Sequence, residues 1–502
     1  MSVEYLKRIL SARVYDVAIE SPLDYAALLS SRLGNSVWLK REDLQPIFSF
    51  KLRGAYNKMS ALSPEELQGG VVASSAGNHA QGVALAARKL GVEAVIVMPI
   101  TTPQIKVDAV RRLGAEVVLK GDNYDGAFEF ASQLCREKGL TFVHPYDDPD
   151  VIAGQGTVGM EILKQLTGPL DAIFVPVGGG GLIAGIAEFV KEMRPDVKVI
   201  GVEPEDADAM DRSLKAGERI RLTSVGSLAD GVAVRQVGVE TFRIVQELVD
   251  EIIVVSNDEI CGAVKEIFED RRSVLEPSGA LAYAGLKRYV ERESAKGLSL
   301  VAIASGANMN FDRLRHISER AEIGERREAV IAVTIPERPG SFKAFCAAIG
   351  ARNVTEFNYR FADSSQAHVF VGLQIADSIE LTETVETLTQ LGYVTIDLTD
   401  NEVAKLHVRH MVGGKAHHVA SETILNFQFP ERPGALMNFL QRMGERWNIS
   451  LFHYRNHGAD FSRVLVGMQV PAGDSGEFER FLAELEYPYT DESANPAIGM
   501  FL

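Results

Sequence analysis

The chain has 502 residues, 46% hydrophobic and 24% charged, which is the composition of an ordinary globular protein long enough for two to four domains. Its 68 acidic residues outnumber its 52 basic ones, and the net charge of −16 argues against nucleic acid and anionic membrane surfaces as partners. The three cysteines form no CxxC pattern, and no apolar run resembles a membrane span or a signal sequence, so we expect a cytoplasmic protein without disulfides.

Short apolar segments alternate with amphipathic ones from residue 37 to about residue 318. The predicted strands are residues 71–74, 94–99, 116–119, 173–177, 199–202 and 300–304. The predicted helices begin at Asn78, near Pro103, near Tyr124 and at Gly181. Continuous Val and Ile runs separated by helices predict an α/β fold with parallel strands buried on both faces. Such sheets bind ligands in the loops at the carboxyl ends of their strands.

Lys51 stands in the segment 49–55 (Ser-Phe-Lys-Leu-Arg-Gly-Ala), after a turn-like Gln45-Pro46 and before a helical run. Taken alone, a lysine on an apolar stretch is more often a surface residue whose stem covers its neighbours. An amine that must condense with a cofactor aldehyde also fits this position. The motifs downstream favour the second interpretation.

Three loops further along the chain follow a strand and enter a helix. Residues 74–79 (Ser-Ser-Ala-Gly-Asn-His) offer N–H groups that suit a carboxylate, although Asn78 alone is as readily an N-cap. Four glycines at 178–181 let the backbone approach a phosphate, and their spacing fits neither a dinucleotide fingerprint nor a P-loop. Ser305 can offer a hydroxyl to a ring nitrogen, although alone it is most often a cap.

The chain repeats itself beyond residues 319–327, a charged stretch that we interpret as a linker. Residues 336–340 (Pro-Glu-Arg-Pro-Gly) recur as 430–434, residues 353–360 as 448–455, and residues 369–375 as 464–470. Two copies are too few for a solenoid. They predict a tandem pair of small ferredoxin-like domains with the order strand, Pro-Gly turn, helix, strand, strand, helix. We expect domains at residues 1–320, 328–400 and 420–502.

The motifs together resemble one enzyme family. Residues 40–45 (Lys-Arg-Glu-Asp-Leu-Gln), the Lys51 segment, residues 75–82 (Ser-Ala-Gly-Asn-His-Ala-Gln-Gly) and the four-glycine loop are similar to those of the biosynthetic threonine dehydratases. These are pyridoxal 5'-phosphate (PLP) enzymes of fold type II, the fold of tryptophan synthase β. The resemblance spans almost the whole chain. It implies a catalytic domain of parallel sheets in two subdomains, followed by a tandem ACT-like regulatory domain.

The resemblance also implies roles for residues of this sequence. Lys51 is the expected catalytic residue and covalent anchor of the cofactor. The residues expected to bind the cofactor are Lys51, Phe50, Asn78, Gly178, Gly179, Gly180, Gly181, Leu182 and Ser305. Within this set Asn78 is expected at the 3-hydroxyl, the glycines at the phosphate and Ser305 at the pyridine nitrogen. The loop expected to bind the substrate carboxylate consists of Ser74, Ser75, Ala76, Gly77, Asn78 and His79.

The implied reaction removes water from L-threonine and yields 2-oxobutanoate and ammonia, the committed step of isoleucine biosynthesis. Lys51, released by the substrate amine, is expected to remove the Cα proton. A neutral serine at position 305 makes the ring a weaker electron sink than an aspartate would, which fits an elimination.

At two positions the sequence differs from the related serine racemases, and these differences argue against racemase activity and against a metal site. Ala76 stands where their second base is expected, and Ala209 stands where an acidic metal ligand is expected, beside Glu203 and Ala207. We therefore predict no racemisation and no metal. The histidines at 407, 410, 417 and 418 lack a pattern that favours metal. Glu276 is either an active-site carboxylate or simply a helix-start residue before a proline.

The two C-terminal copies resemble ACT-like modules, which bind an amino acid near the Pro-Gly turn. The expected regulatory residues are Gly340, Gly434 and Leu436, although a tight turn explains each glycine equally well. The resemblance implies isoleucine as inhibitor, valine as its antagonist and a homotetramer.

Two other functions remain open from the sequence. L-serine dehydration or a β-replacement on the same fold is the nearest alternative, because the pocket shape that separates these substrates is not visible in the sequence. A non-catalytic amino-acid sensor is an alternative from a different class. The presence of Lys51, Asn78, the glycine loop and Ser305 argues against the sensor.

Overall fold

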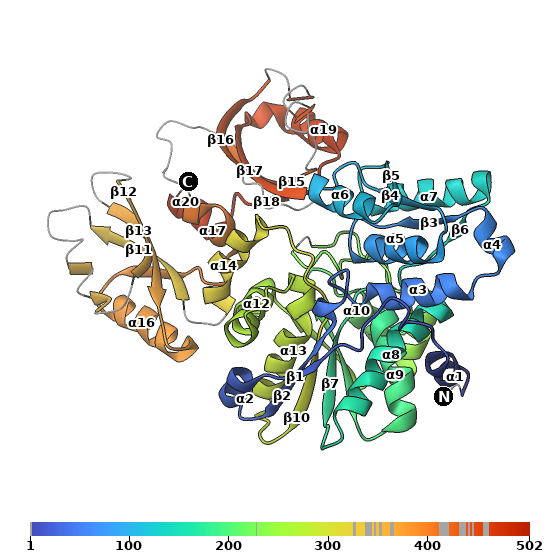
Figure 1. Cartoon of the computed structure of the whole chain (residues 1–502). Helices are drawn as coiled ribbons and strands as arrows, with labels where there is room; N and C mark the ends of the chain where they lie inside the picture. Colours follow the sequence, from blue (N-terminus) through green and yellow to red (C-terminus); the bar gives the residue numbers. More distant parts are fainter. Residues whose placement is uncertain are drawn as a thin grey trace. The chain divides into compact units, whose positions relative to one another are not determined.

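A computed structural model describes residues 3–226, 228–324, 328–336, 344–345, 348–350, 354–361, 366–410, 421–430, 438–439, 442–443, 446–454 and 461–501 (Figure 1). The chain divides into two compact units, Met1–Ile317 and Ser318–Leu502. The predicted regulatory residues Gly340, Gly434 and Leu436 lie outside the described residues. None of the described helices is long and apolar enough to cross a bilayer.

A six-stranded sheet forms the centre of the first unit. Its order is β1-β2-β10-β7-β8-β9, and all neighbours are parallel except β1 and β2. The strands are β1 (Leu23–Tyr25), β2 (Ser36–Arg41), β7 (Ala172–Pro176), β8 (Lys198–Pro204), β9 (Glu251–Val255) and β10 (Ser299–Ala304). Every residue of β7 and β10 is buried, as expected for parallel strands covered by helices on both faces.

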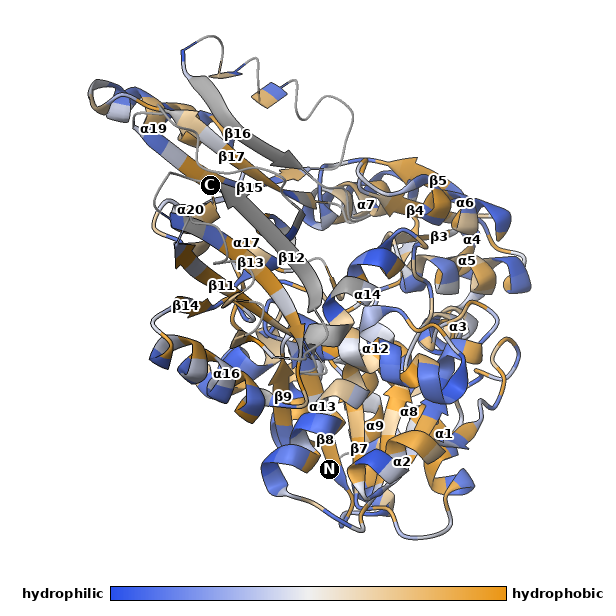
Figure 2. Cartoon of the chain, turned by 90° about the vertical axis from the view of Figure 1, so that its left-hand side faces the viewer, coloured by the Kyte–Doolittle hydropathy of each residue, from blue (hydrophilic) through white to orange (hydrophobic). Residues whose placement is uncertain are grey.

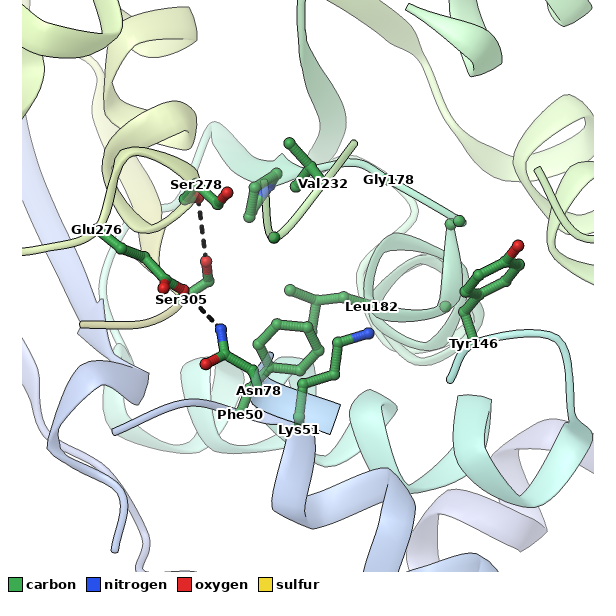
Figure 3. A pocket seen from close by; sticks show the side chains of 15 residues that line it. Phe50, Lys51, Asn78, Tyr146, Gly178, Leu182, Val232, Glu276, Ser278 and Ser305 are labelled. Carbon is green, nitrogen blue, oxygen red and sulfur yellow. Dashed lines mark hydrogen bonds between the residues drawn. The ribbon is translucent and has the colours of Figure 1, made fainter. Parts of the chain in front are cut away.

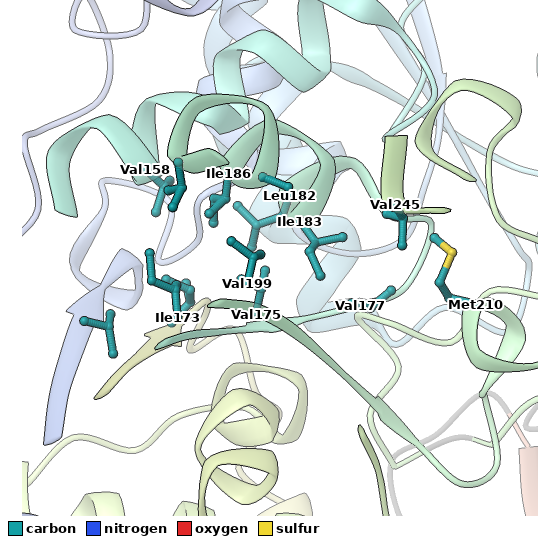
Figure 4. Close-up of a cluster of buried hydrophobic side chains, with 14 of the residues drawn as sticks. Val158, Ile173, Val175, Val177, Leu182, Ile183, Ile186, Val199, Met210 and Val245 are labelled. Atoms are coloured by element: carbon teal, nitrogen blue, oxygen red, sulfur yellow. The ribbon is translucent and has the colours of Figure 1, made fainter. Parts of the chain in front are cut away.

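The helices of this unit outside the second sheet are α1 (Val3–Leu10), α2 (Ala27–Leu33), α8 (Pro149–Gln165), α9 (Gly181–Met193), α10 (Ala209–Ala216), α11 (Val239–Leu248), α12 (Asn257–Arg271) and α13 (Pro277–Glu293). Alternate residues of β7 face opposite sides of the sheet. Ile173 and Val175 join a large apolar cluster with α9 (Figure 4), whereas the ring of Phe174 meets that of Tyr289 on α13 at 5.4 Å. Figure 2 shows β7 and β8 in the orange of apolar residues.

A second sheet, entirely parallel, has the order β5-β4-β3-β6. Its strands are β3 (Val71–Ser74), β4 (Ala94–Met98), β5 (Glu116–Leu119) and β6 (Thr141–Phe142). Its helices are α3 (Lys51–Ala61), α4 (Pro64–Gln68), α5 (Asn78–Leu90), α6 (Gln104–Arg112) and α7 (Tyr124–Lys138). The predicted α/β architecture with two subdomain sheets is confirmed.

Strand β2 does not have an apolar pattern, because it ends in Lys40 and Arg41. The structure buries both side chains with acidic partners: Lys40 lies 2.6 Å from Glu161, and Arg41 lies 2.7 Å from Asp43. A search for apolar runs therefore misses this strand, although it pairs in parallel with β10 along its whole length.

The second unit contains two antiparallel four-stranded sheets with the same topology, β12-β13-β11-β14 and β16-β17-β15-β18. The strands are β11 (Glu328–Pro336), β12 (Val354–Phe361), β13 (Gln366–Gln374), β14 (Val394–Asp397), β15 (Glu422–Pro430), β16 (Asn448–Tyr454), β17 (Phe461–Gln469) and β18 (Tyr489–Asp491). The helices are α16 (Ser378–Gln390), α17 (Glu402–Leu406), α19 (Ser475–Leu485) and α20 (Pro496–Phe501), and α14 (Arg313–Gly324) connects the two units along the chain. The predicted pair of ferredoxin-like domains is confirmed, and each copy has a fourth strand: β14 follows α16, and β18 follows α19. The Pro-Gly turns predicted at 336–340 and 430–434 lie, apart from their first residues, outside the described residues.

The two repeats share a core. Along β11, Ile331 and Val333 pack into the cluster of the first repeat, whereas Val330 and Ala332 face the other way. That second face joins a cluster which also contains residues of β15, β17 and α20. The two sheets of this unit therefore pack against a shared apolar core.

Candidate active site

Four segments that are distant in sequence meet at the carboxyl ends of parallel strands. β2 leads through the 3-10 turn Glu42–Leu44 to Lys51, β10 ends before Ser305, β7 runs into the glycine loop, and β3 of the second sheet precedes Asn78. They form a pocket (Figure 3) lined by Phe50, Lys51, Asn78, Tyr146, Pro176, Gly178, Gly179, Gly180, Gly181, Leu182, Gly231, Val232, Glu276, Ser278 and Ser305. This is the place where α/β sheets bind their ligands.

The pocket brings together every residue that we expect to bind the cofactor, from Phe50 to Ser305. Of the loop expected to bind the substrate carboxylate, Asn78 lines the pocket and the other five residues do not. Ser74 is buried at the end of β3, and the imidazole Nε2 of His79 lies 2.9 Å from the carbonyl of Val143. Burial lowers the pKa of His79 to about 3, so this ring is a neutral part of the core.

Lys51 is the first residue of α3 and reaches into the pocket from below in Figure 3. Its Nζ donates a hydrogen bond to the carbonyl of Pro145 at 3.0 Å and lies 5.2 Å from the centre of the Phe50 ring. Removal from water disfavours the charged amine, and this lowers the pKa of Lys51 from 10.5 to about 8. The amine is therefore far closer to its nucleophilic, neutral form than a surface lysine is.

Small residues bring the start of α3 against two other helices. A Cβ on Gly154 of α8 would lie 2.7 Å from the carbonyl oxygen of Arg53, and one on Gly82 of α5 would lie 3.1 Å from that of Lys51. Gly154 has no room for a side chain, and a side chain at Gly82 would have to push the backbone of Lys51 away. The backbone that carries the lysine is thus clamped between α5 and α8.

Close to Lys51 in the fold lies a buried ion cluster, which consists of Lys40, Glu42, Arg53 and Glu161. The guanidinium of Arg53 donates to Glu42 at 2.8 Å and to Glu161 at 2.6 Å, and Lys40 pairs with Glu161. All four side chains are almost completely inaccessible to water. Two positive and two negative charges compensate each other, which buried ions require. The cluster connects α3, β2 and α8 within two residues of Lys51.

The glycine loop is shaped by its surroundings. Gly180 has φ of 94°, in the left-handed region where only glycine is unstrained, and α9 begins at the next residue. A Cβ on Gly179 would overlap the ring of Tyr146, and the Gly179 carbonyl accepts a 2.6 Å hydrogen bond from Thr241. The first N–H groups of α9 have no acceptor within the helix, and its dipole favours an anion there. A phosphate group fits this cradle.

Two hydroxyls line the wall opposite the glycine loop. The Oγ of Ser305 donates to the carbonyl of Ser278 at 3.2 Å. The Oγ of Ser278 is buried and has no hydrogen-bond partner among the described residues. A buried hydroxyl without a partner is costly unless a ligand satisfies it.

Glu276 is the N-cap residue of α13, but its side chain does not cap the helix. Its carboxylate instead accepts a 2.6 Å hydrogen bond from the amide nitrogen of Asn78, across the pocket floor. Burial, and then the negative charge of Asp230, raise the pKa of Glu276 to about 7. Both interpretations offered by the sequence therefore hold in part: the backbone starts the helix, and the carboxylate belongs to the pocket.

The sequence reveals Tyr146, Gly231, Val232 and Ser278 poorly. Tyr146 and Val232 lie in segments without regular structure, so no periodicity marks them. Ser278 has a signal only through its neighbour Glu276. These residues enter the pocket through tertiary packing that local pattern does not encode.

No group of three or more potential metal-ligating side chains occurs within the described ranges. The oxygens of Glu203 accept the backbone N–H groups of Met210 and Asp211, at 2.9 and 2.8 Å. This buried carboxylate, whose pKa burial raises to about 8, satisfies the first turn of α10.

Comparison with known proteins gives consistent matches along the chain. The pyridoxal-phosphate dependent enzyme family matches residues 14–306, and the C-terminal regulatory domain of threonine dehydratase matches residues 319–408 and 413–502. The chain is 59% identical to the biosynthetic L-threonine dehydratase of Burkholderia multivorans over 504 residues, which cover 100% of this chain and 99% of the relative. It is 52% identical to the biosynthetic L-threonine dehydratase of Escherichia coli over 501 residues, 99% and 97% of the two chains. The solved structure of the processed form of threonine deaminase isoform 2 from Solanum lycopersicum is similar with a TM-score of 0.63 and 54% identity, over 64% of this chain and 88% of that one.

Proposed function

The chain belongs to the biosynthetic threonine dehydratases, pyridoxal-phosphate dependent enzymes with a C-terminal regulatory domain, and from this membership we propose what its own residues do. The reaction is the PLP-dependent deamination of L-threonine to 2-oxobutanoate and ammonia, in isoleucine biosynthesis. High identity to biosynthetic dehydratases over the full length supports this reaction above serine dehydration or β-replacement.

The residues of the pocket fit PLP. The N–H groups of the glycine loop and of α9 would hold the phosphate, Lys51 would meet the aldehyde, Asn78 would offer an amide N–H to the 3-hydroxyl, and the hydroxyl of Ser305 would serve the ring nitrogen. Bound there, PLP supplies an electron sink that acidifies the Cα–H bond of the substrate. The orphaned hydroxyl of Ser278 is a further sign that a polar ligand belongs here.

Lys51 is the observation that carries the proposal. It is the one basic side chain among the fifteen residues that line the pocket, and its pKa of about 8 gives it a larger neutral, proton-accepting fraction near neutral pH than a surface lysine has. We assign it the removal of the Cα proton of threonine. The clamp around α3 keeps this amine in place, and the buried ion cluster behind it anchors the helix.

The first test concerns the phosphate cradle. Gly179→Ala is expected to weaken cofactor binding by about tenfold or more, because the new methyl group must displace the ring of Tyr146. Gly168→Ala is the matched control, since a Cβ there meets nothing within 4 Å. Equilibrium dialysis of PLP against the apoprotein measures both affinities, and equal affinities would contradict the cradle.

The second test concerns the regulatory repeats, which we propose to be residues 328–400 and 420–502. We propose that they bind L-isoleucine as inhibitor and L-valine as its antagonist, with Gly340, Gly434 and Leu436 near the ligand. A coupling of about 1–3 kcal/mol corresponds to a five- to 150-fold change in apparent threonine affinity. Initial rates with isoleucine titrated in should fall sigmoidally and recover with valine. Rates unchanged by isoleucine, with L-alanine as the control, would assign the repeats to another ligand.

We also propose a cytoplasmic homotetramer. The proposal is supported by the family resemblance. Analytical ultracentrifugation of the full chain gives the assembly directly.

A further inference from the structure

Three side chains, those of Glu276, Asn78 and Asn308, form a hydrogen-bonded chain that ends at the backbone carbonyl of Ile47. This chain determines how Asn78 faces the pocket. The amide of Asn308 lies 2.7 Å from the Ile47 carbonyl and 2.7 Å from the amide of Asn78. The amide of Asn78 in turn lies 2.6 Å from Oε1 of Glu276. Glu276 and Asn308 therefore hold Asn78 from its two ends.

The donors and acceptors of this chain have one consistent orientation. A carbonyl only accepts, so the atom of Asn308 beside Ile47 must be Nδ2. The same nitrogen donates its second hydrogen to Asn78, whose facing atom must then be Oδ1. Nδ2 of Asn78 therefore faces Glu276, which accepts one of its two hydrogens. The backbone carbonyl of Ile47 therefore fixes the orientation of both amides.

One N–H of Asn78 has no partner among the described residues, and Asn78 lines the pocket. This leaves one donor, in a fixed direction, for a ligand oxygen. An amide turned by 180° would present its oxygen to that ligand and repel it. Orientation of this amide is thus a condition for binding an anionic ring oxygen.

Glu276 adds a charge beside this donor. It is 4% exposed, and Gly306 packs so closely that a Cβ there would overlap its carboxylate. The charged groups that act on it are Asp230, which disfavours its ionised form, and Lys106 and Arg313, which favour it. Lys106 and Arg313 both pair with Asp230, at 2.7 and 3.2 Å, so most of their charge is already balanced.

We propose that Glu276 and Asn308 are positioning residues that lock Asn78 with one N–H toward the cofactor's ring oxygen, and that the charge of Glu276 tunes the electronic state of the bound ring. The inference rests on the proposed role of Asn78 in binding PLP. Neither residue needs to touch the substrate. Their effect is transmitted through a single amide.

The test uses the full-length holoenzyme and two readouts: PLP affinity by equilibrium dialysis, and the visible absorbance of bound PLP across the range around neutral pH. Asn308→Asp places a carboxylate against Oδ1 of Asn78 and the Ile47 carbonyl, which removes one of the two contacts that hold the Asn78 amide, and it should lower PLP affinity by about tenfold or more. Asn310→Asp adds the same charge two residues away and is the matched control. Glu276→Gln keeps an acceptor for Asn78 and should hold affinity within about twofold.

The pH dependence of the PLP absorbance distinguishes the proposed role of Glu276 from a purely structural one, which would leave this dependence unchanged. The wild-type spectrum should change with a midpoint near pH 7, the pKa to which burial raises Glu276, and Glu276→Gln should remove this transition. A transition that persists in Glu276→Gln, or equal affinities of Asn308→Asp and Asn310→Asp, would overturn the inference. Asn78→Ala separates a failure of this inference from a failure of the proposed PLP-binding role of Asn78. If Asn78→Ala leaves PLP affinity and the spectrum unchanged, the proposed role of Asn78 fails as well.

Discussion

Replacing Lys51 with alanine should reduce the formation of 2-oxobutanoate by about 10⁴-fold or more, because the variant loses its proton acceptor and its covalent anchor for the cofactor together. The pocket contains no second basic side chain among its lining residues that could take over either task. The loss should appear in the turnover number and should persist at saturating threonine and PLP.

Lys89→Ala is the control for this variant, since Lys89 is an exposed lysine on α5. Its turnover should equal that of the unaltered protein. Circular dichroism of Lys51→Ala should match as well, because the ion cluster and the glycine clamp remain. Measurable turnover by a folded Lys51→Ala protein would contradict the assignment of the base.

Replacing Arg53 with methionine should destabilise the catalytic unit by about 3–5 kcal/mol, because the buried carboxylate of Glu42 loses its paired cation and Glu161 keeps only Lys40. Arg53 is completely buried and is paired with both Glu42 and Glu161. The carboxylates must then either stay charged in a dry environment or take up protons. The free energy of unfolding measured in urea should fall accordingly.

The matched control is Arg194→Met. Arg194 forms an ion pair with Asp196 at 2.8 Å, and both side chains are largely exposed. Exposed pairs of this kind contribute little to stability, so Arg53→Met should lower the free energy of unfolding several-fold more than Arg194→Met. Equal losses of stability would contradict the idea that the buried ion cluster anchors α3.

The fold of this chain can be predicted from the sequence where local chemistry repeats a simple pattern. Strands β3, β4 and β7 are mostly apolar runs, and each is followed by a short loop and a helix start. The glycine loop can be recognised in the sequence, because a backbone that closely approaches a phosphate has no room for side chains. The C-terminal repeat is visible because both copies keep the residues of the same turn and strands.

The remaining features depend on partners that are distant in sequence. Lys40 looks like a surface residue until Glu161, on a helix far along the chain, is brought to it. Glu276 looks like a helix-start carboxylate, and only the folded chain shows that its side chain reaches Asn78 instead. Tyr146 packs against Gly179 from a loop without periodicity. Pairings of this kind are created by the topology and leave no local signal.

In the loop expected to bind the substrate carboxylate, the sequence pattern marks more residues than the pocket contains. Its sequence suits a carboxylate from Ser74 to His79, and the structure places Asn78 in the pocket while Ser74 and His79 belong to the core. A strand end entering a helix supplies both buried and exposed positions, and sequence alone does not separate them.

The central claim is tested most directly by the initial rate of 2-oxo acid formation from L-threonine by the PLP-loaded full-length protein. We expect turnover that disappears when PLP is removed and returns when PLP is added back. A fully PLP-loaded protein that forms no 2-oxobutanoate from L-threonine would contradict it.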